Sequence, residues 1–196
     1  MRRALIGLTA LSVIFVLVAV TVVVIRDHRE LPAPSLIGGP FSLTATDGSR
    51  VTEQTYAGKW KLIFFGYTFC PDVCPTTLSN LSIALKSLGS VADRIQPIFI
   101  TVDPERDTPA RLAEYLKAFD SRILGLTGTL EETRAATAAY RVYVGSLPED
   151  GVGSEIEHSA YVYAMDPEGR FVDVIDGGTP SDQFAEKVRA MMDRFL

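Results

Sequence analysis

The chain has 196 residues, 47% of them hydrophobic, with a formal net charge of -5 and only two cysteines and two histidines. No basic stripe accompanies this acidic balance, so the sequence lacks the electrostatic footprint of a nucleic-acid-binding protein and we expect no nucleic-acid partner. Two cysteines are also too few for a small disulfide-stapled scaffold, which spreads many more along its chain.

The first segment is an uncharged apolar run, residues 4–25, rich in valine, leucine, isoleucine and alanine. It is long enough to cross a bilayer of ~30 Å as one helix, and no clear small-residue cleavage site follows it. Arg2 and Arg3 precede the run, whereas acidic neighbours offset the arginines after it, which favours a cytoplasmic N-terminus. We therefore predict a transmembrane anchor over residues 1–30, with the rest of the chain outside the cytoplasm.

The next residues predict a linker and then one domain. Residues 31–40 are rich in proline and glycine, which suits a short segment without regular structure. Residues 41–196 have the length of one compact domain with a real core. Its first part, residues 41–56, alternates in hydrophobicity around Asp47-Gly48, a turn signal that predicts an N-terminal β-hairpin.

A buried strand and a helix flank both cysteines of the chain. Residues 61–67 form a continuous apolar run that is typical of a strand covered on both faces. Beyond the cysteines, leucines recur at helical spacing at Leu78, Leu81, Leu85 and Leu88. Because Pro75 disfavours helical dihedrals at Cys74, we expect the helix to begin at or just after Pro75, with the sulfur atoms of Cys70 and Cys74 in the turn before it.

Further strands and helices follow in alternation. Residues 97–102 predict a second buried strand, and Thr108-Pro109 opens a helix. The apolar face of that helix is formed by Leu112, Tyr115, Leu116 and Phe119. Another helix starts at Thr129, which can form a capping box with Glu132.

The last third of the chain predicts a strand, a hairpin and a helix. The strand is expected at residues 141–144, and the hairpin pairs residues 159–165 with residues 170–175 across an Asp-Pro-Glu-Gly turn. A final helix begins at Thr179-Pro180 and turns four apolar side chains inward, namely Phe184, Val188, Met191 and Phe195. Parallel β-α units followed by a hairpin and a terminal helix indicate an α/β, thioredoxin-like sheet with helices on both faces.

The position of Cys70 and Cys74 favours chemistry at their thiols. At the start of a helix, unpaired amides and the helix dipole stabilise a thiolate. The two thiols can pair with each other or hold one metal ion. With an imidazole added they suit Cu(I), or Cu(II) where a weak further ligand is present, and zinc would accept the same set but usually takes a fourth ligand.

His158 is the candidate for that imidazole. In thioredoxin-like proteins the loop that enters the C-terminal hairpin passes over the cysteine turn, and oxidoreductases of this fold usually place a cis-proline there. This chain has Glu157-His158-Ser159 at that point. By this resemblance the imidazole would face the two sulfur atoms. It would also take the place of the cis-proline that thiol-disulfide exchange enzymes use.

Three motifs together closely resemble the Sco/SenC family. They are the run from Gly66 to Pro75, the run from Thr101 to Pro109, and His158-Ser159 ahead of Asp166-Pro167-Glu168-Gly169. The motifs occur in the order found in the family, and the resemblance covers roughly residues 40 to 196. Members of that family are membrane-anchored, thioredoxin-like copper proteins that help to assemble the dinuclear copper centre of cytochrome c oxidase.

The resemblance implies a function and a set of ligands for this chain. Cys70, Cys74 and His158 would hold copper, as Cu(I) or Cu(II), and the chain would act as a copper metallochaperone without turnover. Asp103 would lie near the site, where it orients His158, offers a weak ligand, contacts the oxidase, or only caps its own turn. Many relatives have aspartate before the histidine, where this chain has Glu157.

The resemblance also implies partners and a location. The partners would be the copper-bearing subunit of cytochrome c oxidase, a periplasmic copper donor and a thiol reductant. The location would be the cytoplasmic membrane of a bacterium, crossed once, with the C-terminal domain in the periplasm.

Two enzymatic functions stay open beside the metallochaperone. In the first, Cys70 or Cys74 attacks a disulfide of the oxidase subunit and the other cysteine resolves the mixed disulfide, which keeps the copper-binding cysteines of the subunit reduced. The second is a peroxidase with a reactive cysteine on the same scaffold. His158 discriminates between copper binding and thiol exchange, because only copper binding needs the imidazole.

Overall fold

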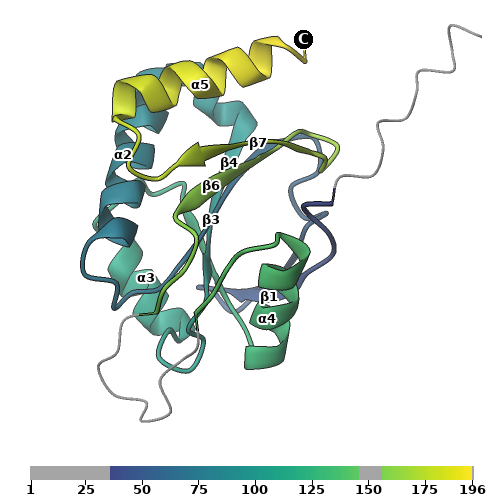
Figure 1. The fold of residues 1–196 in the computed structure, drawn as a ribbon, viewed down its shortest axis with the longest axis vertical. Coiled ribbons are helices and arrows are strands. Elements are labelled where there is room, and N and C mark those ends of the chain that lie inside the picture. The colour runs from purple at the N-terminus through teal and green to yellow at the C-terminus, as the bar shows by residue number, and fades with distance from the viewer. Residues whose placement is uncertain (1–35, 146–155, 196) are drawn as a thin grey trace, which may run out of the picture. The chain divides into compact units, whose positions relative to one another are not determined.

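A computed structural model of the chain describes residues 36–145 and 156–195 (Figure 1). The predicted anchor over residues 1–30 lies outside the described residues. Within the part that is described, no helix is both long and apolar enough to cross a bilayer. The end of the predicted linker lies on the domain, because the amide of Gly38 donates a hydrogen bond to the carbonyl of Ala139 at 2.9 Å.

The described helices and strands alternate through the domain. In chain order they are β1 (Ser42–Ala45), β2 (Arg50–Thr52), β3 (Trp60–Gly66), α2 (Val73–Leu88), the 3-10 helix η1 (Gly89–Arg94), β4 (Ile95–Thr101), α3 (Pro109–Leu116), β5 (Leu124–Thr127), α4 (Leu130–Ala139), β6 (Tyr161–Met165), β7 (Phe171–Asp176) and α5 (Ser181–Asp193). The strands form one sheet in the order β2-β1-β5-β4-β3-β6-β7.

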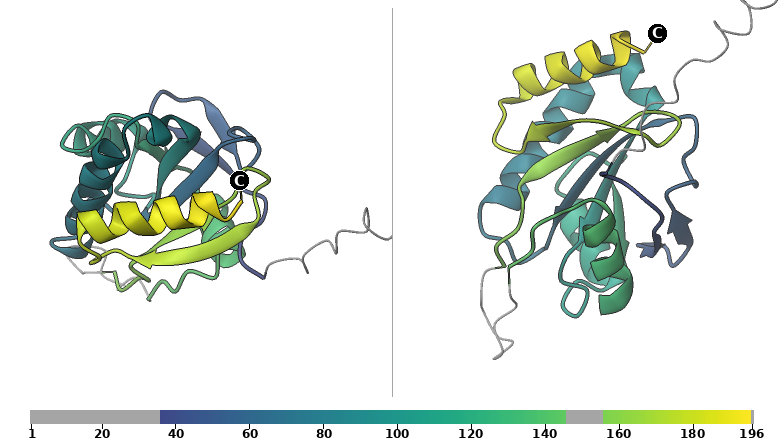
Figure 2. Two further views of the ribbon diagram at one scale, coloured as in Figure 1. Left: turned by 90° about the horizontal axis from the view of Figure 1, so that it is seen from above. Right: turned by 45° about the vertical axis from the view of Figure 1, so that its right-hand side comes forward.

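The centre of the sheet confirms the predicted thioredoxin-like arrangement. Strand β3 pairs in parallel with β4 and antiparallel with β6. Every residue of β3 is buried, and neighbouring residues such as Phe64 and Phe65 point to opposite faces, so both faces of the sheet are covered. Helices α2 and α5 pack against each other, while α3 lies against β5 and α4 near β1 (Figures 1 and 2).

Several local predictions are confirmed. Strands β1 and β2 form the predicted hairpin, with Gly48 at a φ of 85° in its turn, a conformation that glycine adopts at little cost. Strands β6 and β7 form the second hairpin. Thr129 and Glu132 make both hydrogen bonds of the capping box at the start of α4.

One predicted strand is wrong and one strand was missed. Residues 141–144 form no strand, because Arg141 adopts a φ of 52° after α4 and only Val144 makes an isolated β-bridge. The missed strand is β5, whose apolar run is short and interrupted by Gly125. A Cβ at Gly125 would lie 2.6 Å from the side chain of Leu116, so this glycine lets α3 approach the sheet closely.

Two helix predictions need correction at their ends. Helix α2 begins at Val73, ahead of the expected start, so Cys74 and Pro75 lie in its first turn. Proline is tolerated there because the first amides of a helix have no partner within it. At the other end of the chain Phe195 lies beyond α5, is 51% exposed, and contacts the ring of Trp60 edge-on.

Candidate metal centre

The cysteines lie on the turn that joins β3 to α2. The amide of Cys70 donates to the carbonyl of Tyr67 at 3.3 Å, which holds this turn in place. Gly66, the last residue of β3, makes room for the second sulfur, since a Cβ at Gly66 would lie 2.7 Å from Sγ of Cys74. Sequence reasoning missed this role, although a glycine inside a strand is a known signal of close approach.

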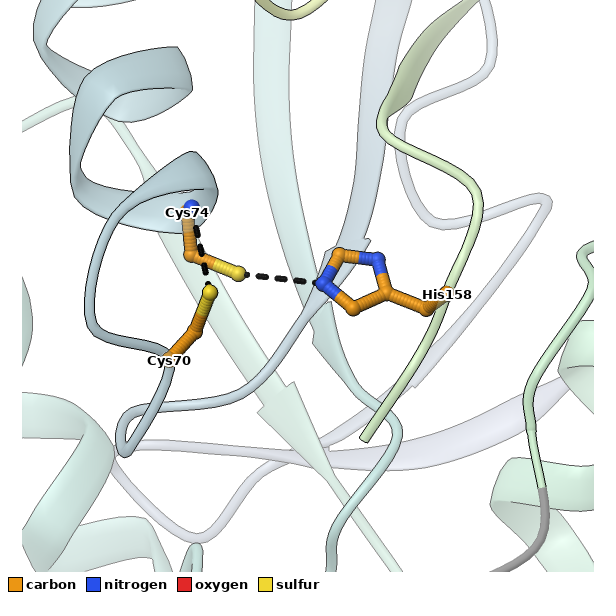
Figure 3. Close-up of side chains that lie close together, drawn as sticks. All are labelled: Cys70, Cys74 and His158. Atoms are coloured by element: carbon orange, nitrogen blue, oxygen red, sulfur yellow. Dashed lines mark hydrogen bonds between the residues drawn. The ribbon is translucent and has the colours of Figure 1, made fainter. Parts of the chain in front are cut away.

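The structure brings together the three residues that the sequence singled out. The Sγ atoms of Cys70 and Cys74 and a ring nitrogen of His158 all lie within 4.8 Å of one another. Figure 3 shows the sulfur of Cys74 pointing at the imidazole, and its Sγ lies 3.3 Å from Nε2 of His158. The amide of Cys74 donates to Sγ of Cys70 at 3.4 Å. Both cysteines are free thiols, so all three donor atoms are available to one ion.

His158 is held by an isolated β-bridge and by Tyr67. It forms a β-bridge with Val144, and its Nδ1 lies 3.1 Å from the carbonyl oxygen of Ser159. Because a carbonyl only accepts, this contact favours the proton on Nδ1 and leaves Nε2 free to coordinate. The hydroxyl of Tyr67 accepts a hydrogen bond from the amide of Ile156 at 2.9 Å, and the ring of Tyr67 meets the imidazole edge-on.

Asp103 lies outside the donor cluster. Its side chain is buried, forms an ion pair with Arg106, and is not among the three clustered donors in the described part of the chain. Its backbone carbonyl accepts from the amide of Asp107 at 2.9 Å, so the residue also belongs to the turn after β4. These contacts agree with a role of Asp103 in shaping the turn after β4 and in positioning Arg106.

A second buried carboxylate, Asp107, ties the cysteine turn to the end of β4. It accepts hydrogen bonds from the amide and the hydroxyl of Thr68 at 3.0 and 2.6 Å, and from the hydroxyl of Thr101 at 2.7 Å. Sequence reasoning missed this network, because an aspartate before Thr-Pro looks like part of a helix start. Burial raises the pKa of Asp107 in spite of these three donors.

Removing the Asp107 carboxylate is expected to destabilise the domain. Asp107→Ala leaves the buried amide of Thr68 without its acceptor, which costs about 1–3 kcal/mol. Because the folded-state pKa of Asp107 is raised, the folded protein binds this proton more tightly than the unfolded chain, and the contribution of Asp107 to stability grows as the pH falls through the raised pKa. Denaturant unfolding should therefore show the free-energy difference between wild type and Asp107→Ala widening from neutral to mildly acidic pH, and a constant difference would contradict this prediction.

The two thiols differ in their affinity for a proton. Hydrogen bonds donated by the thiol and the amide of Cys74 lower the pKa of Cys70 to about 5, against the opposing effect of burial. The pKa of Cys74 is raised, because its proton is shared with the Cys70 sulfur and because its side chain is buried. Of the two sulfurs, the environment therefore favours the thiolate at Cys70.

This asymmetry predicts the titration of the reduced, metal-free protein. As the pH is raised, the ultraviolet absorbance of thiolate should increase with a midpoint at a pH of about 5. The size of the increase should correspond to one thiolate per chain. Cys70→Ser should remove this step, whereas Cys74→Ala should move it towards the ordinary range, because the donor to Cys70 is lost. Two thiolates that titrate together above neutral pH would contradict the assignment.

The donor set fits copper. Thiolates are the soft ligands that select Cu(I), imidazole also suits copper, and the three donor atoms lie within 4.8 Å of one another. An open pocket of about 440 Å³ lies beside them, and Cys70, Val73, Tyr143 and His158 are among the residues that line it. An ion or a ligand-bearing loop of another protein can therefore reach the sulfur of Cys70 from solvent.

The fold and the site define a thioredoxin-like protein with a Cys-Cys-His centre at the start of α2. Comparison with known proteins narrows this class. Residues 29–193 match the SCO1/SenC family profile, and the chain belongs to that family.

Curated relatives and solved structures agree with this assignment. The chain is 44% identical over 170 residues to mitochondrial SCO1 of Saccharomyces cerevisiae, covering 83% of this chain and 57% of the relative. It is 39% identical over 168 residues to the mitochondrial SCO1 homologue of Homo sapiens, covering 84% of this chain and 56% of that protein. The chain thus spans a little over half the length of these curated relatives.

Two solved structures that are similar to this chain have copper bound. Bradyrhizobium japonicum ScoI with copper bound has a TM-score of 0.73 and 43% identity, and the match covers 79% of this chain and 99% of that one. Yeast Sco1 with copper bound has a TM-score of 0.77 and 40% identity, and the match covers 82% of this chain and 90% of that one.

Proposed function

We propose that this chain is a copper chaperone that helps to assemble the dinuclear copper centre of cytochrome c oxidase. Cys70, Cys74 and His158 hold one copper ion, which then passes by ligand exchange to the copper-bearing subunit of the oxidase. The protein binds and transfers its cargo without turnover.

The observation that carries the proposal is the cluster of two thiols and one imidazole. The cysteines and the histidine come from segments far apart in the sequence, yet their donor atoms lie within 4.8 Å of one another beside an open pocket. A structural site would be closed, whereas a transfer site must let the ligands of a partner approach the ion. Membership of the Sco family supports copper as the ion. The motifs that resemble this family in the sequence support oxidase assembly as the task.

The reductase alternative has less support. Thioredoxin-like oxidoreductases present backbone to a substrate beside a cis-proline, but every peptide bond of the described residues is trans, and His158 stands opposite the cysteines. The imidazole so close to both sulfurs favours metal binding over attack on a disulfide of another protein.

The proposal extends to the location of each part of the chain. We propose that residues 1–30 anchor the protein in the bacterial cytoplasmic membrane, that residues 31–40 link the anchor to the domain, and that residues 41–196 work in the periplasm. The support is the uncharged apolar run at residues 4–25 and the paired arginines before it.

Anaerobic copper titration tests the proposed function. The full chain, reduced and solubilised in detergent, should bind one Cu(I) per chain, and a purified copper-binding fragment of the oxidase subunit should then acquire that copper. Cys74→Ser is the matched control, because it keeps the fold of the turn but loses a ligand. Failure of the wild type to bind one copper, or copper that never moves to the fragment, would contradict the proposal.

A further inference from the structure

Phe69, the residue before Cys70, is an aromatic side chain left half exposed between two arginines. It is 50% exposed, and the guanidinium carbons of Arg106 and Arg111 lie 5.0 and 4.8 Å from the centre of its ring. Stacking of this kind contributes about 0.5–1 kcal/mol at an exposed site and holds the ring in one orientation. We call Phe69, Arg106 and Arg111 the arginine rim.

The two arginines of the rim differ in how their charges are matched. Arg106 forms an ion pair with the buried carboxylate of Asp103 and also stacks on the ring of Tyr67 at 5.8 Å. Arg111, on α3, donates from Nε to the hydroxyl of Thr68 at 3.4 Å and has no carboxylate partner among the described residues. Its remaining N–H donors are therefore available to a carboxylate from another molecule.

Exposed carboxylates, as well as the arginine rim, lie near Cys70. Asp72 and Glu157 are exposed and line the pocket that opens beside the donor cluster, together with Tyr143, which is 61% exposed. Arg111 is not among the residues that line this pocket, so the surface around Cys70 carries exposed carboxylates and also a guanidinium without a carboxylate partner among the described residues. Such a mixture of charges can fix the direction from which a partner approaches.

We propose that the arginine rim docks an acidic segment of the protein that accepts the copper. Ligand exchange requires that the donor atoms of the acceptor reach the ion while Cys70 or His158 still holds it, so the acceptor must contact the surface next to Cys70. Exposed aromatic and arginine side chains are the residue types that most often carry binding energy at interfaces. A carboxylate of the acceptor pairs with Arg111 and packs over Phe69. This inference rests on the proposed function and names the surface that serves it.

Copper transfer by charge-altered variants tests the rim. The full chain in detergent, loaded with one Cu(I), is mixed at low ionic strength with a purified copper-binding fragment of the oxidase subunit, and the second-order transfer rate is measured. Arg111→Glu should transfer copper at least about fivefold more slowly at unchanged copper affinity, and added salt should shrink the difference. Arg111→Lys should keep most of the rate, because it keeps the charge.

The matched control is Arg189→Glu, the same charge reversal on α5, where Arg189 donates to the carbonyl of Ser87 near the far end of α2. This variant should transfer copper at the wild-type rate. Equal rates for Arg111→Glu and wild type, an equal loss in Arg189→Glu, or a loss of copper affinity in Arg111→Glu would each overturn the docking role. Wild-type protein that binds no copper would instead overturn the proposed function, so the two failures are distinguishable. Arg111→Gln provides the same comparison if Arg111→Glu fails to fold.

Discussion

Replacing His158 with alanine is expected to lower the affinity for Cu(I) by more than about 100-fold, because loss of a direct ligand should exceed the 10–100-fold cost of losing an outer partner. Among the described residues the imidazole belongs to a cluster of three donors within 4.8 Å of one another, and its Nε2 already faces the sulfur of Cys74 at 3.3 Å. Competition with a Cu(I) chelator of known affinity, under anaerobic conditions, measures the change.

The neighbouring substitution Glu157→Gln is the control for the His158 variant. Glu157 is exposed and lines the same pocket, but it is not one of the clustered donors. Its loss should change copper affinity little. If Glu157→Gln and His158→Ala weaken copper binding equally, the three-ligand site is wrong.

The same His158 variant separates the metal site from thiol exchange. Cys70 and Cys74 belong to one turn and one helix start, so His158→Ala should leave them able to form a disulfide when an oxidant is added. Retained disulfide formation together with lost copper affinity would show that the imidazole serves the ion. An unchanged absorption spectrum of the copper-loaded variant would argue for a site built from the thiols alone.

The sequence could predict the donor set because its chemistry depends on few residues and on a common topology. Cys70 and Cys74 follow a strand whose apolar run is unmistakable, and the loop before a C-terminal hairpin must cross that turn in this fold. Together these two constraints place His158 opposite the sulfur atoms. No exact element boundary is needed, so the misplaced start of α2 did not affect the prediction.

What could not be predicted depends on packing between segments that are distant in sequence. Strand β5 owes its place in the sheet to β4 and β1, while its own apolar run is short. Asp107 becomes a buried acceptor only because the turn at Thr68 lies above it. The arginine rim likewise exists only once α3 is folded beside Phe69. None of these contacts leaves a periodic signal in the sequence.

Gly66→Ala is expected to disturb both the core and the metal centre. A Cβ at this position would lie 2.7 Å from Sγ of Cys74 and 2.8 Å from the ring of Phe99, distances that require one of these groups to move. Overpacking of this kind costs about 1–3 kcal/mol in the free energy of unfolding. Because Cys74 is fully buried, its sulfur can move only towards His158 or into the packed core, so copper affinity should fall as well.

A double-mutant cycle identifies the group responsible for this cost. Cys74→Ala removes the sulfur that the new methyl group would meet, so Gly66→Ala should destabilise the Cys74→Ala protein less than the wild type, and the remaining cost should report the contact with Phe99. Denaturant unfolding of the four metal-free proteins provides the comparison. Equal costs in the two backgrounds would mean that Gly66 does not make room for the cysteine. A clear difference would mean that the glycine at the end of β3 sets the position of the second sulfur and, through it, the geometry of the copper site.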